Sequence, residues 1–167
     1  MDTKRLWISG ALFALIGSAT ASADAAVYGT MNGSACQSVY DNTWPYGTNI
    51  FYNGNINSND AVNAKYVVCP LPRQNVTSTN GLSAAYVTLN DPTSGSMWCQ
   101  LTSFDFFGNV VASSGAIMSG GNGKRLVPLT GIATSSAWGN YSLFCTMPPR
   151  GSSGGAATIY SYLWVEN

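Results

Sequence analysis

The 167-residue chain contains no histidine and very few charged residues. Charged side chains make up 8% of it, against about 25% in an ordinary soluble domain, and 7 basic residues balance 7 acidic ones. Without histidine there is no Ser-His-Asp or Cys-His catalytic device and no histidine-ligated zinc or copper site. So few basic residues also argue against the basic patch that nucleic-acid binding requires.

The first residues predict a secretory signal peptide. Lys4 and Arg5 precede an apolar stretch from Leu6 to Ile16. This stretch is too short to span a bilayer, which takes about 20 apolar residues. Small residues with Ala-x-Ala patterns follow, and we expect cleavage after Ala23. Residues 1–23 would then be removed, leaving residues 24–167 as one secreted or periplasmic domain without a later membrane span.

The 4 cysteines predict two disulfides, because an even number in an exported chain implies a covalent framework. Their spacing matches no metal-ligand pattern. Three pairings are possible, and strand parity favours Cys36–Cys69 with Cys99–Cys145. Cys99 shares a strand face with Met97 and Leu101, and Cys145 shares one with Tyr141 and Leu143, so both thiols are expected to face a core.

The remaining sequence predicts an all-β fold. Short runs rich in β-branched and aromatic residues alternate with turn residues, and no helical period extends over ten residues. We expect an antiparallel β-sandwich, jelly-roll-like or Ig-like, with about 8–9 short strands. The expected strands are 26–31, 47–52, 64–71, 82–90, 96–104, 109–118, 124–130, 140–147 and 157–166, with a two-residue hairpin turn at Gly108-Asn109.

Aromatic residues are the most suggestive candidates for a binding site. Along the last strand, alternation places Tyr160, Tyr162 and Trp164 on the face opposite Ile159, Leu163 and Val165. Such a strip offers a platform for sugar rings or a partner, and Trp44 and Tyr46 form a second aromatic group. The alternative is that these rings fill a core or a subunit contact.

Other chemistries have weaker support. The oxygen-rich segment 55–60, with Asp41 and Asn42, contains ligand types that calcium accepts, but not in the order of a dedicated loop. A plain polar loop is the alternative.

A hydrolase acting on glycosidic bonds would need two carboxylates flanking the bond that is cleaved, and no Asp pair stands out by spacing. No phosphate-binding or dinucleotide motif is present, so we expect no cofactor.

Several segments together resemble small exported proteins of Gram-negative bacteria. The resemblance is carried by Gly33-Ser34-Ala35-Cys36, Tyr66–Leu71, Trp98-Cys99-Gln100-Leu101, Tyr141–Pro148 and Ile159–Glu166. These are cysteine and strand motifs, and they bring no catalytic set with them. The resemblance implies a disulfide-containing β-sandwich outside the cytoplasm.

These observations favour a secreted, non-catalytic domain that binds glycan or cell-surface material. A surface poor in Lys and Glu and rich in Gly, Ser, Thr and Asn suits contact with a polar, uncharged partner. Two alternatives stay open at this point. One is a self-associating subunit of an extracellular fibre or coat, and the other is a hydrolase using paired Asp.

Overall fold

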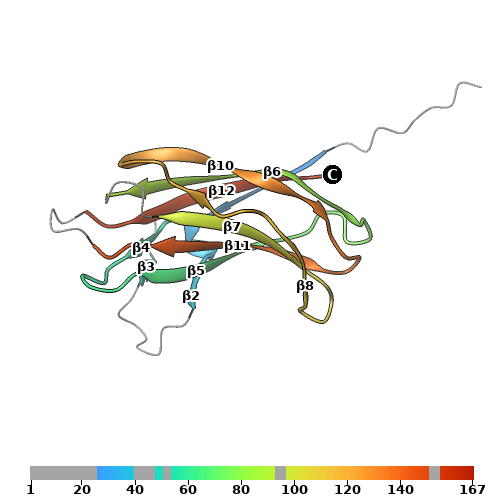
Figure 1. Ribbon diagram of the computed structural model, residues 1–167, viewed down its shortest axis with the longest axis horizontal. Helices are drawn as coiled ribbons and strands as arrows, with labels where there is room; N and C mark the ends of the chain where they lie inside the picture. The colour runs from blue at the N-terminus through green and yellow to red at the C-terminus, as the bar shows by residue number, and fades with distance from the viewer. Residues whose placement is uncertain (1–25, 40–47, 51–53, 93–96, 151–154) are drawn as a thin grey trace, which may run out of the picture.

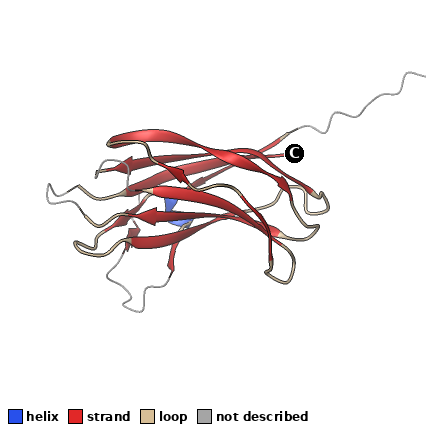
Figure 2. Cartoon of the chain, in the orientation of Figure 1, coloured by secondary structure: helices blue, strands red, loops and turns tan. Residues whose placement is uncertain are grey.

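The computed structural model describes residues 26–39, 48–50, 54–92, 97–150 and 155–167. The expected cleavage site and residues 1–25 lie outside this part of the chain. Within it the secondary structure is almost entirely β, with one short 3-10 helix (Figure 2). None of the described residues forms a helix long and apolar enough to cross a membrane.

Two antiparallel six-stranded sheets form the sandwich, as expected from the sequence (Figure 1). Sheet A has the order β10-β6-β12-β4-β3, with β1 also pairing β12. Its strands are β1 (Val27–Asn32), β3 (Thr48–Ile50), β4 (Ile56–Ser58), β6 (Asn80–Asp91), β10 (Gly123–Thr134) and β12 (Thr158–Glu166).

Sheet B has the order β2-β5-β11-β7-β8, with β9 also pairing β7. Its strands are β2 (Gln37–Val39), β5 (Lys65–Leu71), β7 (Trp98–Phe104), β8 (Val110–Ser113), β9 (Ile117–Met118) and β11 (Asn140–Met147), and the 3-10 helix η1 (Gly33–Ala35) precedes β2. From β4 onward the chain moves between the sheets repeatedly, as in a jelly roll.

The described strands outnumber the expected ones for local reasons. The expected strand 109–118 is divided into β8 and β9, and the short strands β2 and β4 give almost no periodic signal. The expected two-residue hairpin turn at Gly108-Asn109 is wrong. β7 ends at Phe104 because the carboxylate of Asp105 accepts the backbone N–H groups of Phe107 and Asn109, which makes a longer turn.

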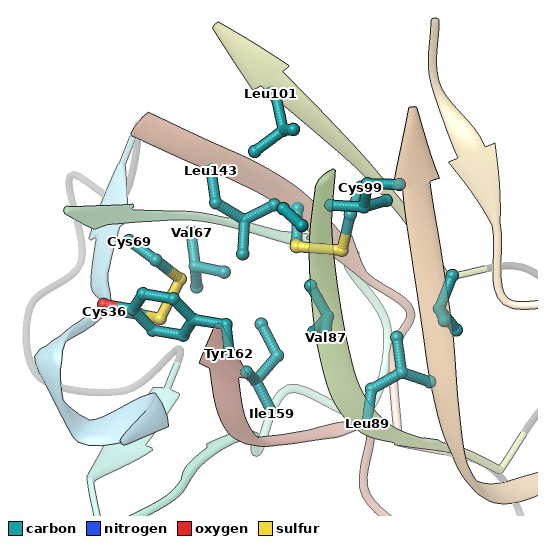
Figure 3. Close-up of a cluster of buried hydrophobic side chains, with 14 of the residues drawn as sticks. Cys36, Val67, Cys69, Val87, Leu89, Cys99, Leu101, Leu143, Ile159 and Tyr162 are labelled. Carbon is teal, nitrogen blue, oxygen red and sulfur yellow. A yellow bond between two sulfur atoms is a disulfide. The ribbon is translucent and has the colours of Figure 1, made fainter. Parts of the chain in front are cut away.

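The core lies between the sheets and is built by residues alternating along each strand. β5 and β7 show strict alternation of buried and outward residues. The inward side chains include Val67, Leu101 and Leu143 from sheet B and Val87, Leu89 and Ile159 from sheet A (Figure 3). Burial of this shared apolar layer holds the two sheets face to face.

Both disulfides have the expected pairing: Cys99–Cys145 joins the neighbouring strands β7 and β11 of sheet B, and Cys36–Cys69 joins the residue before β2 to β5. Cys99 lies directly opposite Cys145 in the β7–β11 register. Cys36 immediately precedes β2, whose Gln37 pairs with Val68 of β5. The bridges therefore fix the register within sheet B on its core side (Figure 3).

Candidate functional site

The sequence-predicted strip on β12 does not form. Tyr162 and Trp164 are 2% and 1% exposed and belong to the core together with Ile159, so the expectation of one outward face is wrong. The cause is a β-bulge, because the β12–β6 register shifts between Ile159 and Ser161. The extra residue in β12 reverses the side of the sheet to which each later side chain of the strand points.

The two buried rings have structural contacts. Tyr162 and Trp164 stack with centroids 6.3 Å apart, and the Tyr162 hydroxyl donates a hydrogen bond to the Pro70 carbonyl at 2.9 Å. Burial raises the pKa of Tyr162. The environment of both rings is that of core residues.

The other predicted aromatic residues are placed elsewhere. Tyr160 is half-buried, and the Nζ atom of Lys124 on β10 lies 4.3 Å from the centroid of its ring. Trp44 and Tyr46 fall outside the described residues. Of the three predicted ligand residues that the structure describes, Tyr162 and Trp164 therefore lie in the core and only Tyr160 is partly exposed.

The outer face of sheet B holds an aromatic row that the sequence reasoning missed. Tyr66 of β5, Phe144 of β11 and Trp98 of β7 come from three adjacent strands. The rings of Tyr66 and Phe144 stack with centroids 5.8 Å apart and planes at 23°. The centroids of Trp98 and Phe144 are 5.6 Å apart, with the planes tilted by 43°. All three rings point away from the core and are partly exposed.

Strand parity could have found this row. Adjacent residues of a strand face opposite sides of the sheet. If Cys99 and Cys145 point toward the core, their neighbours Trp98 and Phe144 must point outward. The register then brings them together, since Thr146 pairs with both Tyr66 and Trp98. What the sequence alone could not supply was the order of the three strands.

A hollow of about 760 Å³ lies beside this row on the same face. Phe144 borders it, and Phe104 also lines it. Polar but uncharged side chains form part of its lining, as do aliphatic ones and one glycine; the full lining is Val39, Val68, Gln100, Thr102, Phe104, Gly108, Val110, Ser113, Asn140, Ser142 and Phe144. The lining thus combines two aromatic rings with amide and hydroxyl groups and carries no charge.

The β7–β8 hairpin supplies part of this lining, and hydrogen bonds to Asp105 hold its turn. Asp105 Oδ1 accepts the N–H groups of Phe107 and Asn109 at 2.9 and 2.8 Å, and its Oδ2 accepts the Asn109 amide at 2.9 Å. Gly108 completes the turn with φ of +87°. Across β7, the side-chain amide of Gln100 donates to the Ser114 carbonyl at 2.7 Å. Of the polar lining groups, the amide of Gln100 is therefore held by a hydrogen bond within the protein.

The described carboxylates are all occupied by structural contacts. Asp91 accepts the Ser119 hydroxyl at 2.5 Å and the Met97 N–H at 2.9 Å. Glu166 pairs with Arg73 at 3.1 Å. Asp105 holds its own turn, and Asp60 is paired with Lys65 at 3.0 Å. A catalytic Asp pair finds no support in the described part of the chain.

The same contacts bear on the calcium expectation. Asp60 Oδ1 accepts the N–H groups of Val62 and Asn63 at 2.8 and 2.9 Å. These bonds hold the pKa of Asp60 far below its ordinary value, with the Asn63 backbone bond the largest cause. Asp41 and Asn42 lie outside the described residues, and the described ranges contain no cluster of three Cys, Asp or Glu side chains suited to a metal.

No protein-family model and no curated protein sequence matches the chain. Among solved structures, it is similar to the CBM36-1 domain of a multidomain xylanase from the hindgut metagenome of Trinervitermes trinervoides. The TM-score is 0.48 at 10% identity, over 84% of this chain and 98% of that one. It is likewise similar to the low-affinity xylan-binding module CBM86 from Roseburia intestinalis, with a TM-score of 0.48 at 10% identity over 84% and 96% of the chains.

A family two carbohydrate esterase from Cellvibrio japonicus also matches, with a TM-score of 0.46 and 9% identity over 85% of this chain. The match spans 34% of the esterase chain. At these identities the similarity concerns the β-sandwich fold alone.

Proposed function

We propose that this protein is a non-catalytic binding domain for neutral glycan, and that the ligand lies on the outer face of sheet B. The observation that carries the proposal is the uncharged hollow between Phe144 and Phe104, with Gln100, Thr102 and Ser142 among its lining residues. Aromatic rings stack on the apolar faces of sugars, while amides and hydroxyls exchange hydrogen bonds with sugar hydroxyls. A lining without charge favours neutral over acidic sugars.

Preorganisation supports the same proposal. The hollow lies on strands whose register is fixed by two disulfides, and part of its lining comes from a hairpin fixed by Asp105. Side chains that are already ordered lose little entropy when a ligand binds. A shallow site of this kind fits binding to a polymer chain that passes across the face.

Calorimetric titration with soluble oligosaccharides tests the proposal. The probes are hexasaccharides of cellulose, xylan, mannan, chitin and β-1,4-galactan. We expect at least one to bind wild type, and the double variant Trp98→Ala/Phe144→Ala to lose at least tenfold in affinity. Tyr28→Ala is the matched control, because Tyr28 is 72% exposed on sheet A, and it should bind as wild type does.

Removing two half-buried rings also removes packing and can destabilise the fold. A second variant therefore separates loss of binding from loss of stability. Ser142→Glu adds bulk and charge to the hollow without deleting an apolar contact, and it should abolish binding while the thermal midpoint stays close to that of wild type. Absence of binding across the panel, or unchanged affinity in folded Ser142→Glu, overturns the proposal.

Export belongs to the same proposal. Two disulfides and no described free cysteine fit an oxidising compartment. We propose that residues 1–23 are removed on export and that residues 24–167 act in the periplasm or outside the cell. The intact mass of protein recovered from the periplasm or the culture medium should correspond to a chain that begins at Asp24 with all four thiols oxidised.

A further inference from the structure

Three hollows on the outer face of sheet B meet at one residue, Val68 of β5. The main hollow is the one of about 760 Å³ already described. An edge hollow of about 270 Å³ lies over β2, and a side hollow of about 450 Å³ lies where β5 ends and β11 begins. Val68 lines all three, so together they form one depression with arms in three directions.

The main hollow and the edge hollow follow one line across the sheet. The strand registers place Gln37, Val68, Phe144 and Gln100 in a row across β2, β5, β11 and β7. This row has an amide at each end, with an aliphatic and an aromatic side chain between them. Since neighbouring strands are about 4.8 Å apart, the row is about 14 Å long. It gives the backbone of a glycan chain a path across the strands.

The side hollow leaves this row along the strands. On β5 its lining continues from Val68 through Pro70 to Arg73, and on β11 it continues from Ser142 to Asn140. The row follows the hydrogen-bonding direction of the sheet, which is perpendicular to its strands. A straight chain that follows the row therefore cannot also occupy the side hollow. A group attached to that chain near Val68 can reach it, because the three hollows meet there.

The chemistry of the side hollow suits a neutral sugar. Among the described residues that line it, Arg73 is the one that carries a charge, and its side chain is 2% exposed and paired with Glu166 at 3.1 Å. Asn140 and Ser142 contribute an amide and a hydroxyl, and proline and valine side chains contribute apolar surface. Its volume of about 450 Å³ is within the range of about 300–1,000 Å³ that small-molecule sites occupy.

We propose that the glycan bound by sheet B is a neutral polysaccharide that carries side chains. Its backbone follows the row from Gln37 to Gln100, and one side-chain sugar enters the side hollow. This inference rests on the proposed function, because it names the class of glycan for the same site. It also makes Val76 a specificity residue, since Val76 lines the side hollow and neither of the other two.

Calorimetric titration with pairs of oligosaccharides that share a backbone tests the inference. The pairs are cellohexaose, xylohexaose and mannohexaose, each compared with the same chain bearing xylose, arabinose and galactose side groups, respectively. For the backbone that it recognises, wild type should bind the substituted member at least tenfold more tightly. Val76→Trp fills the side hollow and should remove this advantage while the affinity for the linear member stays unchanged. Val62→Trp is the control, because Val62 is 79% exposed in the segment between β4 and β5, and it should keep the advantage.

Two further variants complete the test. Gln37→Ala, at one end of the row, should weaken the linear and the substituted member by the same factor. Thermal melting shows whether Val76→Trp is folded, and Val76→Glu, which also occupies the side hollow, takes its place if it is not. Equal or weaker binding of the substituted member, or an advantage that survives in the folded Val76 variant, overturns the inference and leaves the proposed function intact. Binding of neither member of any pair overturns both.

Discussion

The ring of Phe144 stacks on that of Tyr66 across the β11–β5 pair, while the next residue, Cys145, is bonded to Cys99 on the opposite side of the same sheet. The side chains of β11 thus alternate between the two faces of sheet B, and each face has a different role. The inward residues carry the covalent framework, and the outward residues carry the aromatic row. Since the disulfide fixes the β7–β11 register, it also fixes the position of Trp98 relative to Phe144.

Loss of the Cys99–Cys145 bridge should therefore cost stability. The bridge closes 46 residues, and the chain-entropy model gives about 4 kcal/mol for a loop of that size. We expect the double variant Cys99→Ala/Cys145→Ala to lose about that much in unfolding free energy, measured by urea denaturation of oxidised protein. The matched variant Cys36→Ala/Cys69→Ala should lose a similar amount. A loss below about 1 kcal/mol in both would contradict the role given to the bridges.

Gly29 is required by a core ring. A Cβ atom at this position would lie 2.1 Å from Cζ2 of Trp164, the residue it pairs with across β1 and β12. We predict that Gly29→Ala lowers the unfolding free energy by about 2 kcal/mol, since the well-packed indole must shift. Gly115→Ala is the control, because a Cβ there meets nothing within 4 Å. Equal stability of the two variants would rule out this account of Trp164 packing.

The Arg73–Glu166 pair is buried, with the side chains 2% and 0% exposed. Arg73 also donates to the carbonyls of Ser136, Asn75 and Ser78, and Glu166 accepts the Gln74 N–H at 2.7 Å. Removing one charge leaves the other uncompensated, so Glu166→Gln should destabilise by about 3 kcal/mol in urea denaturation.

A double-mutant cycle with Arg73→Met checks that coupling. Because each single variant leaves an unpaired buried group, the double variant should be less damaging than the sum of the two single variants. Strict additivity would show that the two side chains act independently.

Acid should destabilise the fold through two turn carboxylates. Bonds from Asn109, side chain first and then backbone, hold the pKa of Asp105 below its ordinary value, and bonds from Asn63, Val62 and Lys65 do the same for Asp60. A carboxyl whose pKa is lower in the folded state stabilises at pH above its unfolded value, near 4. That contribution is lost as the pH falls further.

Urea denaturation between pH 7 and pH 2 measures this effect. Stability should fall below about pH 4 in wild type, and less steeply in Asp105→Asn and in Asp60→Asn. An identical acid slope in wild type and in both variants would mean that other groups control the acid response.

Sequence reasoning succeeded where alternation was unbroken and failed where it was not. Alternation along β7 and β11 correctly predicted that Cys99 and Cys145 point into the core. The pattern of short strands and turns correctly predicted the fold class. On β12 the same reasoning failed, because the bulge after Ile159 placed Tyr162 and Trp164 in the core. Nothing local marks a bulge in this stretch, since it is a property of pairing with β6.

The site itself required tertiary information. Tyr66, Trp98 and Phe144 are distant in sequence, and their proximity follows from the strand order β5-β11-β7. Each residue alone is an ordinary outward aromatic. Once the strand order is known, parity is enough to identify the row.

The central claim is tested most directly by amide and indole chemical shifts in an NMR titration with the oligosaccharide that binds most tightly. We predict that the shift changes gather on the outer side of sheet B, at the side-chain amides of Gln100 and Asn140 and at the Trp98 indole, while Tyr28, Leu126 and Leu163 on sheet A stay unchanged. Changes confined to sheet A, or the absence of change at saturating oligosaccharide, would contradict the claim.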